Sequence, residues 1–306
     1  MSSLSRRVDH AARIFRLLAE LILFAAVVLS LQPLSSAGDI PLRTSGLPRP
    51  VTEIPFKAYQ TYLIVVDGRI GTREHQNLLL DTGSNPSMID RSVSADLGLK
   101  GISRDLSAFN KSVASESVVL SDLEFGPLQR RNLQVMVADF SAIDRELDTR
   151  IDAVVGLDVL GGTNFTVDYQ KSRISFGATR QPHTAPLIAE RQYLAVNLKN
   201  GGRQLHLLLD TGTPQLVLFE SHLGGADFVW SNAVGSGHNI SGNVHFATVV
   251  LTEAKLGGQN VGPQRASVVS SRKELQSDLD GLMGLSCLRP KRISFDFEHQ
   301  TLGWSE

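Results

Sequence analysis

Short apolar runs recur along the chain from residue 56 onward, separated by glycine, proline and polar residues typical of turns. Residues 117–125 and 133–137 alternate apolar and polar side chains on either side of Gly126-Pro127, as half-buried antiparallel strands do. Residues 244–251 alternate in the same way over much of their length. The pattern predicts a mainly β protein with short helical segments, such as residues 90–97 ending at Gly98.

One pattern occurs twice along the chain. Residues 78–84 read Leu-Leu-Leu-Asp-Thr-Gly-Ser, and residues 207–213, which lie 129 positions later, read Leu-Leu-Leu-Asp-Thr-Gly-Thr. An apolar-apolar-Gly segment follows each, with Gly156 75 residues after Asp81 and Gly284 74 residues after Asp210. Each half then closes with a strand that begins Arg-Ile-Ser-Phe. We therefore expect an internal duplication, with one half over residues 56–180 and the other over residues 181–306.

The N-terminal segment is typical of an export signal. Four arginines lie between residues 6 and 16, residues 17–31 are apolar apart from Glu20 and Ser30, and small residues precede Gly38. Residues 1–37 are expected to be a signal peptide cleaved after Ala37 or an uncleaved N-terminal anchor. The proline-rich residues 38–55 are expected to be an extended linker or a first strand. The folded part is then extracytoplasmic, either periplasmic or secreted, and free or anchored to the inner membrane.

Composition and charge narrow the classes of partner. The 306 residues include 42% hydrophobic residues, which is enough for a sizeable core, and 30 Lys and Arg balance 31 Asp and Glu. This balance lacks the basic footprint of nucleic-acid binding. Cys287 is the single cysteine, and the histidines lack the spacing of metal ligands, so neither a disulfide scaffold nor a metal or other cofactor is expected.

The two Asp-Thr-Gly segments are the strongest candidates for chemistry. Each Asp directly follows an apolar strand, and the glycine allows another backbone to approach closely. If two homologous halves pack about a twofold axis, Asp81 and Asp210 meet at that axis. Two adjacent carboxylates share one proton, so one acts as general base and the other as general acid. Such a pair can direct a water molecule at an amide carbonyl without a covalent intermediate.

These motifs resemble those of the pepsin and retropepsin superfamily of aspartic proteases over about residues 56–306. The resemblance implies an all-β, bilobal pepsin-like fold, made of two retropepsin-like lobes related by a pseudo-twofold axis and active as a monomer. Compact exported or membrane-tethered bacterial enzymes, including the periplasmic polarity-factor protease, are the most similar type.

The resemblance also implies roles for individual residues. Asp81 and Asp210 correspond to the catalytic pair, and the hydroxyls of Thr82 and Thr211 bond across to the opposite loop. The outer oxygens of the two aspartates are then bonded by Ser84 and Thr213. The remaining support comes from the loop glycines and from the segments beneath the loops, which are Gly83, Gly212, Val154, Val155, Gly156, Leu282, Met283 and Gly284.

The sequence departs from pepsin-like enzymes in the segment that would cover the cleft. Residues 102–117 contain no tyrosine, and Phe109 is their single aromatic residue. Residues 109–115 and 234–243 are both expected to be hairpin tips, and the second carries the polar residues His238 and Asn239. Either tip is a candidate flap. The roughly eighteen residues after Ala37 are too few for a propeptide that fills the cleft.

The sequence therefore predicts an aspartic-type endopeptidase, a hydrolase that cleaves extracytoplasmic proteins bound as extended segments between two lobes. The alternative is a catalytically silent peptide-binding or regulatory module with a protease-like fold. The two hypotheses differ in what Asp→Asn at position 81 or 210 should do, because only turnover requires both carboxylates.

Overall fold

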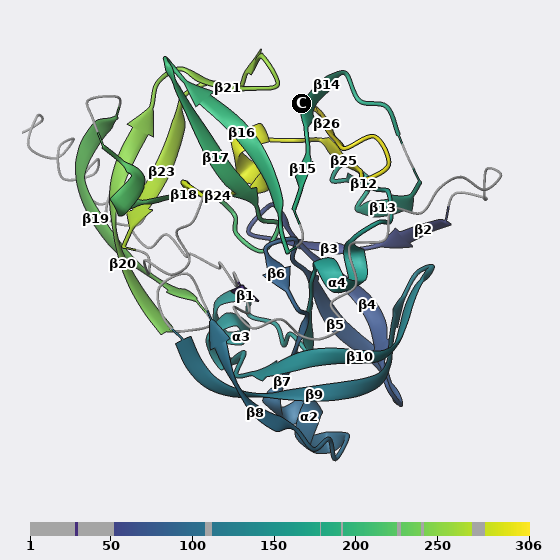
Figure 1. Cartoon of the computed structure of the whole chain (residues 1–306). Coiled ribbons are helices and arrows are strands. Elements are labelled where there is room, and N and C mark those ends of the chain that lie inside the picture. The colour runs from purple at the N-terminus through teal and green to yellow at the C-terminus, as the bar shows by residue number, and fades with distance from the viewer. Residues whose placement is uncertain are drawn as a thin grey trace, which may run out of the picture.

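The computed structural model describes residues 28–29, 52–107, 112–177, 179–190, 192–224, 228–239, 242–270 and 279–306. Strands dominate this part of the chain and its helices are short, so the predicted mainly β class is confirmed. The strands form an eight-stranded, a ten-stranded and a six-stranded sheet, and one isolated two-stranded pair (Figure 1).

The eight-stranded sheet is built from the first half of the sequence. Its strands lie in the order β3 (Lys57–Tyr59), β4 (Leu63–Ile70), β5 (Arg73–Leu80), β11 (Ala153–Val155), β7 (Met88–Asp90), β10 (Leu128–Ala138), β9 (Ser112–Phe125) and β8 (Ile102–Ser107). Strand β4 also pairs with β9, which curls the sheet back on itself.

The ten-stranded sheet is built from the second half. Its order is β19 (Val229–Asn239), β20 (Gly242–Leu251), β23 (Gln264–Val269), β18 (Leu216–Phe219), β24 (Gly281–Met283), β17 (Arg203–Leu209), β16 (Leu194–Asn200), β21 (Ala254–Leu256) and β22 (Gln259–Asn260), with β15 (Ile188–Ala189) also on β16.

The eight-stranded and ten-stranded sheets have the same order and direction of their equivalent strands. Strand β5 runs parallel to β11 as β17 runs parallel to β24, and β11 is antiparallel to β7 as β24 is antiparallel to β18. Strands β7 and β10 are parallel, as are β18 and β23. The internal repeat of the sequence thus has a structural counterpart in strand order and direction.

The six-stranded sheet combines strands from both halves. Its order is β14 (His183–Pro186), β26 (Thr301–Ser305), β25 (Arg292–Asp296), β12 (Phe165–Asp168), β13 (Arg173–Phe176) and β2 (Thr52–Pro55). Strands β12 and β25 form its antiparallel centre, where the rings of Phe165 and Phe295 stack with centroids 4.5 Å apart.

The expected equivalence of the two Arg-Ile-Ser-Phe strands is wrong. Strand β25 lies in the central pair beside β12, whereas β13 lies outside β12 and β26 lies outside β25. By position β13 therefore matches β26, although their sequences differ. Both copies of Arg-Ile-Ser-Phe instead flank the same strand, β12.

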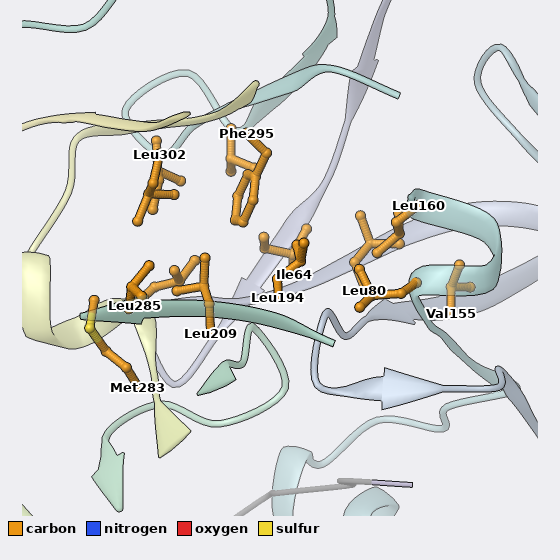
Figure 2. Packing of buried hydrophobic residues seen from close by; sticks show 14 of the residues in the cluster. Ile64, Leu80, Val155, Leu160, Leu194, Leu209, Met283, Leu285, Phe295 and Leu302 are labelled. Atoms are coloured by element: carbon orange, nitrogen blue, oxygen red, sulfur yellow. The ribbon is translucent and has the colours of Figure 1, made fainter. Parts of the chain in front are cut away.

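The main hydrophobic core is shared by all three sheets. Figure 2 shows Leu80 and Val155 of the first half, Leu209 and Met283 of the second half, and Phe295 of the six-stranded sheet in this cluster. All five side chains are at least 98% buried. The strands that end at the two Asp-Thr-Gly segments are therefore fixed by packing on one continuous core.

The predicted helix is present as α2 (Arg91–Asp96), where Asp90 caps the first turn by accepting a hydrogen bond from the Ser92 N–H, and Gly98 follows with φ 61°. Further short helices in the described ranges are α3 (Ser141–Leu147), α4 (Leu157–Leu160), η1 (Glu220–His222) and η3 (Leu285–Leu288). The predicted hairpin around Gly126-Pro127 is also present. Its strands are longer than expected, since β9 begins at Ser112 rather than at residue 117 and β10 begins at Leu128 rather than at residue 133.

The expected leader and linker lie mostly outside the described residues. In the expected leader the structure describes β1 (Val28–Leu29), which runs parallel to β6 (Ser84–Asn85). In the expected linker it describes β2, at the edge of the six-stranded sheet. Among helices in the described ranges, none has the length and apolar character needed to cross a membrane.

Candidate active site

The two aspartates lie at equivalent points of the two sheets. Asp81 directly follows β5, and its N–H donates to the carbonyl of Val155 on the parallel neighbour β11 at 2.9 Å. Asp210 follows β17, and its N–H donates to the carbonyl of Met283 on β24 at 3.0 Å. The segments expected beneath the loops therefore hold the backbone of each aspartate.

Thr82 and Thr211 lock the two loops together through four reciprocal hydrogen bonds. The Thr82 N–H donates to the Thr211 hydroxyl at 3.0 Å, and the Thr211 N–H donates to the Thr82 hydroxyl at 3.1 Å. Each hydroxyl then donates to a carbonyl of the opposite half, that of Leu209 or Leu80, at 2.7 Å. The cross-bonding role expected for both threonines agrees with these contacts.

The glycines bring each loop directly over the carboxylate of the other half. A Cβ atom on Gly83 would lie 2.5 Å from Cγ of Asp210, and one on Gly212 would lie 2.6 Å from Oδ2 of Asp81. Each glycine N–H also donates to Oδ1 of the aspartate in its own loop at 2.8 Å. Asp81 and Asp210 thus meet at one point, and glycine is required there because of space.

Burial makes two full negative charges at this point costly. Asp81 is 1% and Asp210 0% exposed. Burial raises the pKa of Asp81 to about 6, although bonds from Asp210 and from backbone N–H groups oppose the rise. Burial and the adjacent negative charge of Asp81 raise the pKa of Asp210 well above its ordinary value. The raised pKa values therefore favour a pair that holds one proton and one negative charge over a pair that holds two negative charges.

The glycines that end the supporting segments are also required by close packing. A Cβ on Gly156 would lie 2.9 Å from the carbonyl carbon of Ser84, and one on Gly284 would lie 2.5 Å from the backbone nitrogen of Gln215. These segments therefore touch the loop just beyond each Asp-Thr-Gly. The contacts fix the height of each loop relative to its sheet.

The hydroxyls of Ser84 and Thr213 do not bond the aspartates, which corrects the expectation. Ser84 Oγ donates to the Pro86 carbonyl at 3.0 Å, because that acceptor lies within the same tight turn. Thr213 Oγ1 is buried and has no hydrogen-bond partner among the described residues. The backbone N–H groups of Ser84 and Thr213, rather than their hydroxyls, lower the carboxyl pKa values against burial.

Asp158 is a supporting residue that the sequence interpretation missed. Its carboxylate accepts bonds from the Ser87 hydroxyl at 2.5 Å and the Ser87 N–H at 3.0 Å. The Ser87 hydroxyl in turn accepts a bond from the Gly156 N–H at 2.8 Å. Asp158 thereby ties the chain after the first Asp-Thr-Gly to the supporting segment. The internal repeat does not predict this role, because Asp158 lies two residues after Gly156 whereas Ser286 occupies the equivalent position after Gly284.

Substituting Asp158 with Ala should reduce the free energy of unfolding by about 2 kcal/mol, because two bonds to a charged acceptor are lost at a partly exposed site. Denaturant unfolding followed by circular dichroism measures the change. Ser286→Ala is the matched control, since the Ser286 side chain bonds no described residue, and should change stability by less than ~0.5 kcal/mol. An equal effect of both substitutions would show that the Ser87 contacts contribute nothing.

The residues proposed for a flap are only partly described. Phe109 lies outside the described residues. His238 and Asn239 lie in the strand β19, paired with Asn243 and Gly242 of β20, so this segment is a hairpin as expected. Helix α3 of the first half contacts β19, and β1 contacts β8 as well as β6. Which hairpin acts as a flap stays a prediction.

The described residues give little support to a metal site or to a cysteine nucleophile. They contain no group of three His, Cys, Asp or Glu side chains placed to hold a metal ion. Cys287 is 3% exposed, and burial raises the pKa of its thiol to about 12. A thiol with that pKa is not ionised at neutral pH and is a poor nucleophile.

Comparison with known protein families agrees with this geometry. Residues 66–159 match a family model described as aspartyl protease. The matched region contains the first Asp-Thr-Gly segment, its supporting Val154-Val155-Gly156 and the Asp158 contact. No curated protein matches the chain. The match shows that this part of the first half is similar to aspartyl proteases.

Proposed function

We propose that the chain is an aspartic endopeptidase in which Asp81 and Asp210 together activate one water molecule. The observation that carries the proposal is the reciprocal contact of the two Asp-Thr-Gly loops, which places two buried carboxyl groups at one point. The match to the aspartyl protease model covers one of these loops, and the equivalent bonds of the second loop supply its counterpart.

The reaction follows from a pair that carries one proton. The ionised carboxylate takes a proton from water as the water oxygen attacks the peptide carbonyl carbon, and the protonated carboxyl gives its proton to the carbonyl oxygen. The tetrahedral product then loses its amine, whose nitrogen receives a proton from the carboxyl that accepted one. As the C–N bond breaks, one hydroxyl of the tetrahedral intermediate returns its proton to the other carboxylate and becomes the C=O of the product acid, so the pair again holds one proton.

The substrate in this proposal is an extended segment of a protein, bound by backbone hydrogen bonds between the active loops and the hairpins formed by β8–β9 and β19–β20. Because both Asp-Thr-Gly loops belong to one chain, one copy is sufficient for a complete site. The proposal includes two lobes related by a pseudo-twofold axis, a monomer, and an extracytoplasmic location directed by the N-terminal segment. The matching strand order of the eight-stranded and ten-stranded sheets supports the two related lobes.

The pH dependence tests the shared proton. Since the pKa of Asp81 lies near 6 and burial with the adjacent charge of Asp81 also raises the pKa of Asp210 above its ordinary value, activity should fall as the pH drops below about 6, where both carboxyls become protonated. The optimum should therefore be less acidic than for a pair with ordinary carboxyl pKa values. Initial rates on an unfolded protein from pH 3 to 9 measure the profile, and a maximum at pH 3 would contradict this assignment.

The same pKa values predict how stability changes with pH. Both pKa values are raised above the unfolded value of 3.8, so between pH 4 and 6 the folded pair keeps protons that the unfolded chain releases. The contribution of the pair to stability is thus fully present below pH 4 and is lost as the pH rises through 6. Substituting Asp210 with Asn should flatten this part of the stability profile.

A further inference from the structure

The six-stranded sheet has a polar outer face created by the two copies of Arg-Ile-Ser-Phe. Strand β12 lies between them, so Asp168 is paired with Arg173 on one side and Arg292 on the other. Thr166 is likewise paired with Ser175 and with Ser294. One acidic residue therefore faces two arginines, and a row of hydroxyl side chains lies beside them.

Residues of β2, β12, β13 and β25 line a groove of about 280 Å³. These strands lie in the upper right of Figure 1. We call it the cation groove. The charged residues that line it are Lys171, Arg173, Arg180, Arg292, Glu53 and Asp168, so its cations outnumber its anions by two.

Both acidic residues of the groove already have partners. Asp168, which is 5% exposed, accepts bonds from Arg292 Nε at 2.7 Å and from the Lys171 backbone N–H at 3.0 Å. Glu53 accepts a bond from the Ser175 hydroxyl at 2.9 Å. By contrast, the side chains of Arg173 and Arg180 form no hydrogen bond or ion pair with any described residue, and the Lys171 side chain acts on Asp168 only through its charge, without a hydrogen bond. The groove thus has three cationic side chains available for a ligand.

The wall of the groove is built from hydroxyl groups rather than apolar side chains. Thr166 is 4% exposed, contacts the Thr179 hydroxyl, and donates to Ser294 Oγ at 3.0 Å. The Gln181 amide donates to Thr179 at 3.5 Å. These contacts fix the segment that carries Arg180 against the sheet, so Arg180 and Arg173 rim the same opening.

We infer that the cation groove binds a phosphate-bearing anion, at a site separate from the aspartate pair. Guanidinium groups present paired N–H donors that match phosphate oxygens, and ammonium and hydroxyl groups add further donors. The phosphate can belong to a soluble ester or to an anionic phospholipid headgroup. A lipid source fits the proposed N-terminal anchor, because only fourteen residues, 38–51, separate the expected leader from β2, which contributes Glu53.

The test uses the full chain and three probes. These are inorganic phosphate and glycerol 3-phosphate in titration calorimetry, and vesicles of phosphatidylglycerol or phosphatidylcholine in a flotation assay. The double substitution Arg173→Gln with Arg180→Gln should weaken binding at least about tenfold, because two charge-assisted contacts are lost. Proteolysis of a soluble substrate should be unchanged. The matched control, Lys199→Gln with Arg265→Gln, removes two exposed positive charges elsewhere and should leave binding intact.

Each outcome decides the inference. Binding of glycerol 3-phosphate that the groove variant alone weakens supports a soluble ester, and selective loss of phosphatidylglycerol vesicle binding supports a lipid headgroup. The inference is overturned if no probe binds, or if the control variant weakens binding as much as the groove variant does. Circular dichroism verifies that both variants are folded. Because activity is not the readout, the result stands independently of the proposed proteolysis.

Discussion

Replacing either Asp81 or Asp210 with Asn should lower the rate of peptide cleavage at least ~10³-fold, with the chain still folded. Asn has nearly the same shape as Asp but can neither take a proton from water nor give one to the carbonyl oxygen. Because the two carboxyls act as one unit, each single substitution should be about as damaging as the double substitution. Cleavage of an unfolded protein mixture, followed by mass spectrometry of the new termini, measures the effect.

Asp67→Asn is a suitable control, since Asp67 is an exposed acidic residue of the first half with a 66% exposed side chain, and it should retain full activity. Stability distinguishes loss of chemistry from loss of fold. At neutral pH both site variants should be at least as stable as the original chain, because Asn removes a buried group with a raised pKa. Cleavage that survives either substitution would refute the proposed pair. A folded original chain that binds peptide without cutting it would favour the silent binding module.

The second large effect concerns stability, and we expect Gly212→Ala to cost more than about 3 kcal/mol. The added methyl group would lie 2.6 Å from Oδ2 and 2.7 Å from Oδ1 of Asp81. Cβ atoms in proteins essentially never lie this close to a neighbouring heavy atom. Relief requires the loops to separate, which breaks the bonds between Thr82 and Thr211. The variant should therefore lose activity even under conditions in which it stays folded.

Gly202→Ala provides the matched control, since no atom lies within 4 Å of a methyl group there and Gly202 has no positive φ. It should be neutral or slightly stabilising, because alanine restricts the unfolded chain. Thermal unfolding of both variants, with activity measured below the transition, separates the two cases. If Gly212→Ala were as stable and active as Gly202→Ala, the close contact between the two loops would be refuted.

The sequence was informative where local pattern and tertiary contact coincide. Strands β5 and β17 each end in three consecutive leucines. The Asp-Thr-Gly that follows each run is typical of a tight turn. The spacing to Gly156 and Gly284 predicted which segments lie beneath the turns, because parallel partners of equivalent strands must recur at equivalent distances. The strand class and the short helix α2 followed from the same local rules.

The remaining features depend on contacts that a single sequence does not encode locally. The similarity of residues 173–176 and 292–295 indicated equivalent strands, but sheet order is set by packing across both halves. The Ser84 hydroxyl donates to the Pro86 carbonyl, and the position of that acceptor follows from the geometry of the turn rather than from the motif. Helix α3 was missed although its signal exists, since Asp139 accepts a bond from the Ser141 N–H and Ile143 and Leu147 are buried one turn apart.

The reciprocal bonds between Thr82 and Thr211 also bear on when the site can form during synthesis. They join residues 129 positions apart, so the site depends on one of the most non-local contacts in the chain. The Asp210 N–H is in turn held by the Met283 carbonyl of β24, so a ribosome must deliver most of the second half before Asp210 can be fixed beside Asp81. If the proposed function is correct, the nascent first half has no complete aspartate pair, and proteolysis should begin only after most of the chain has been synthesised.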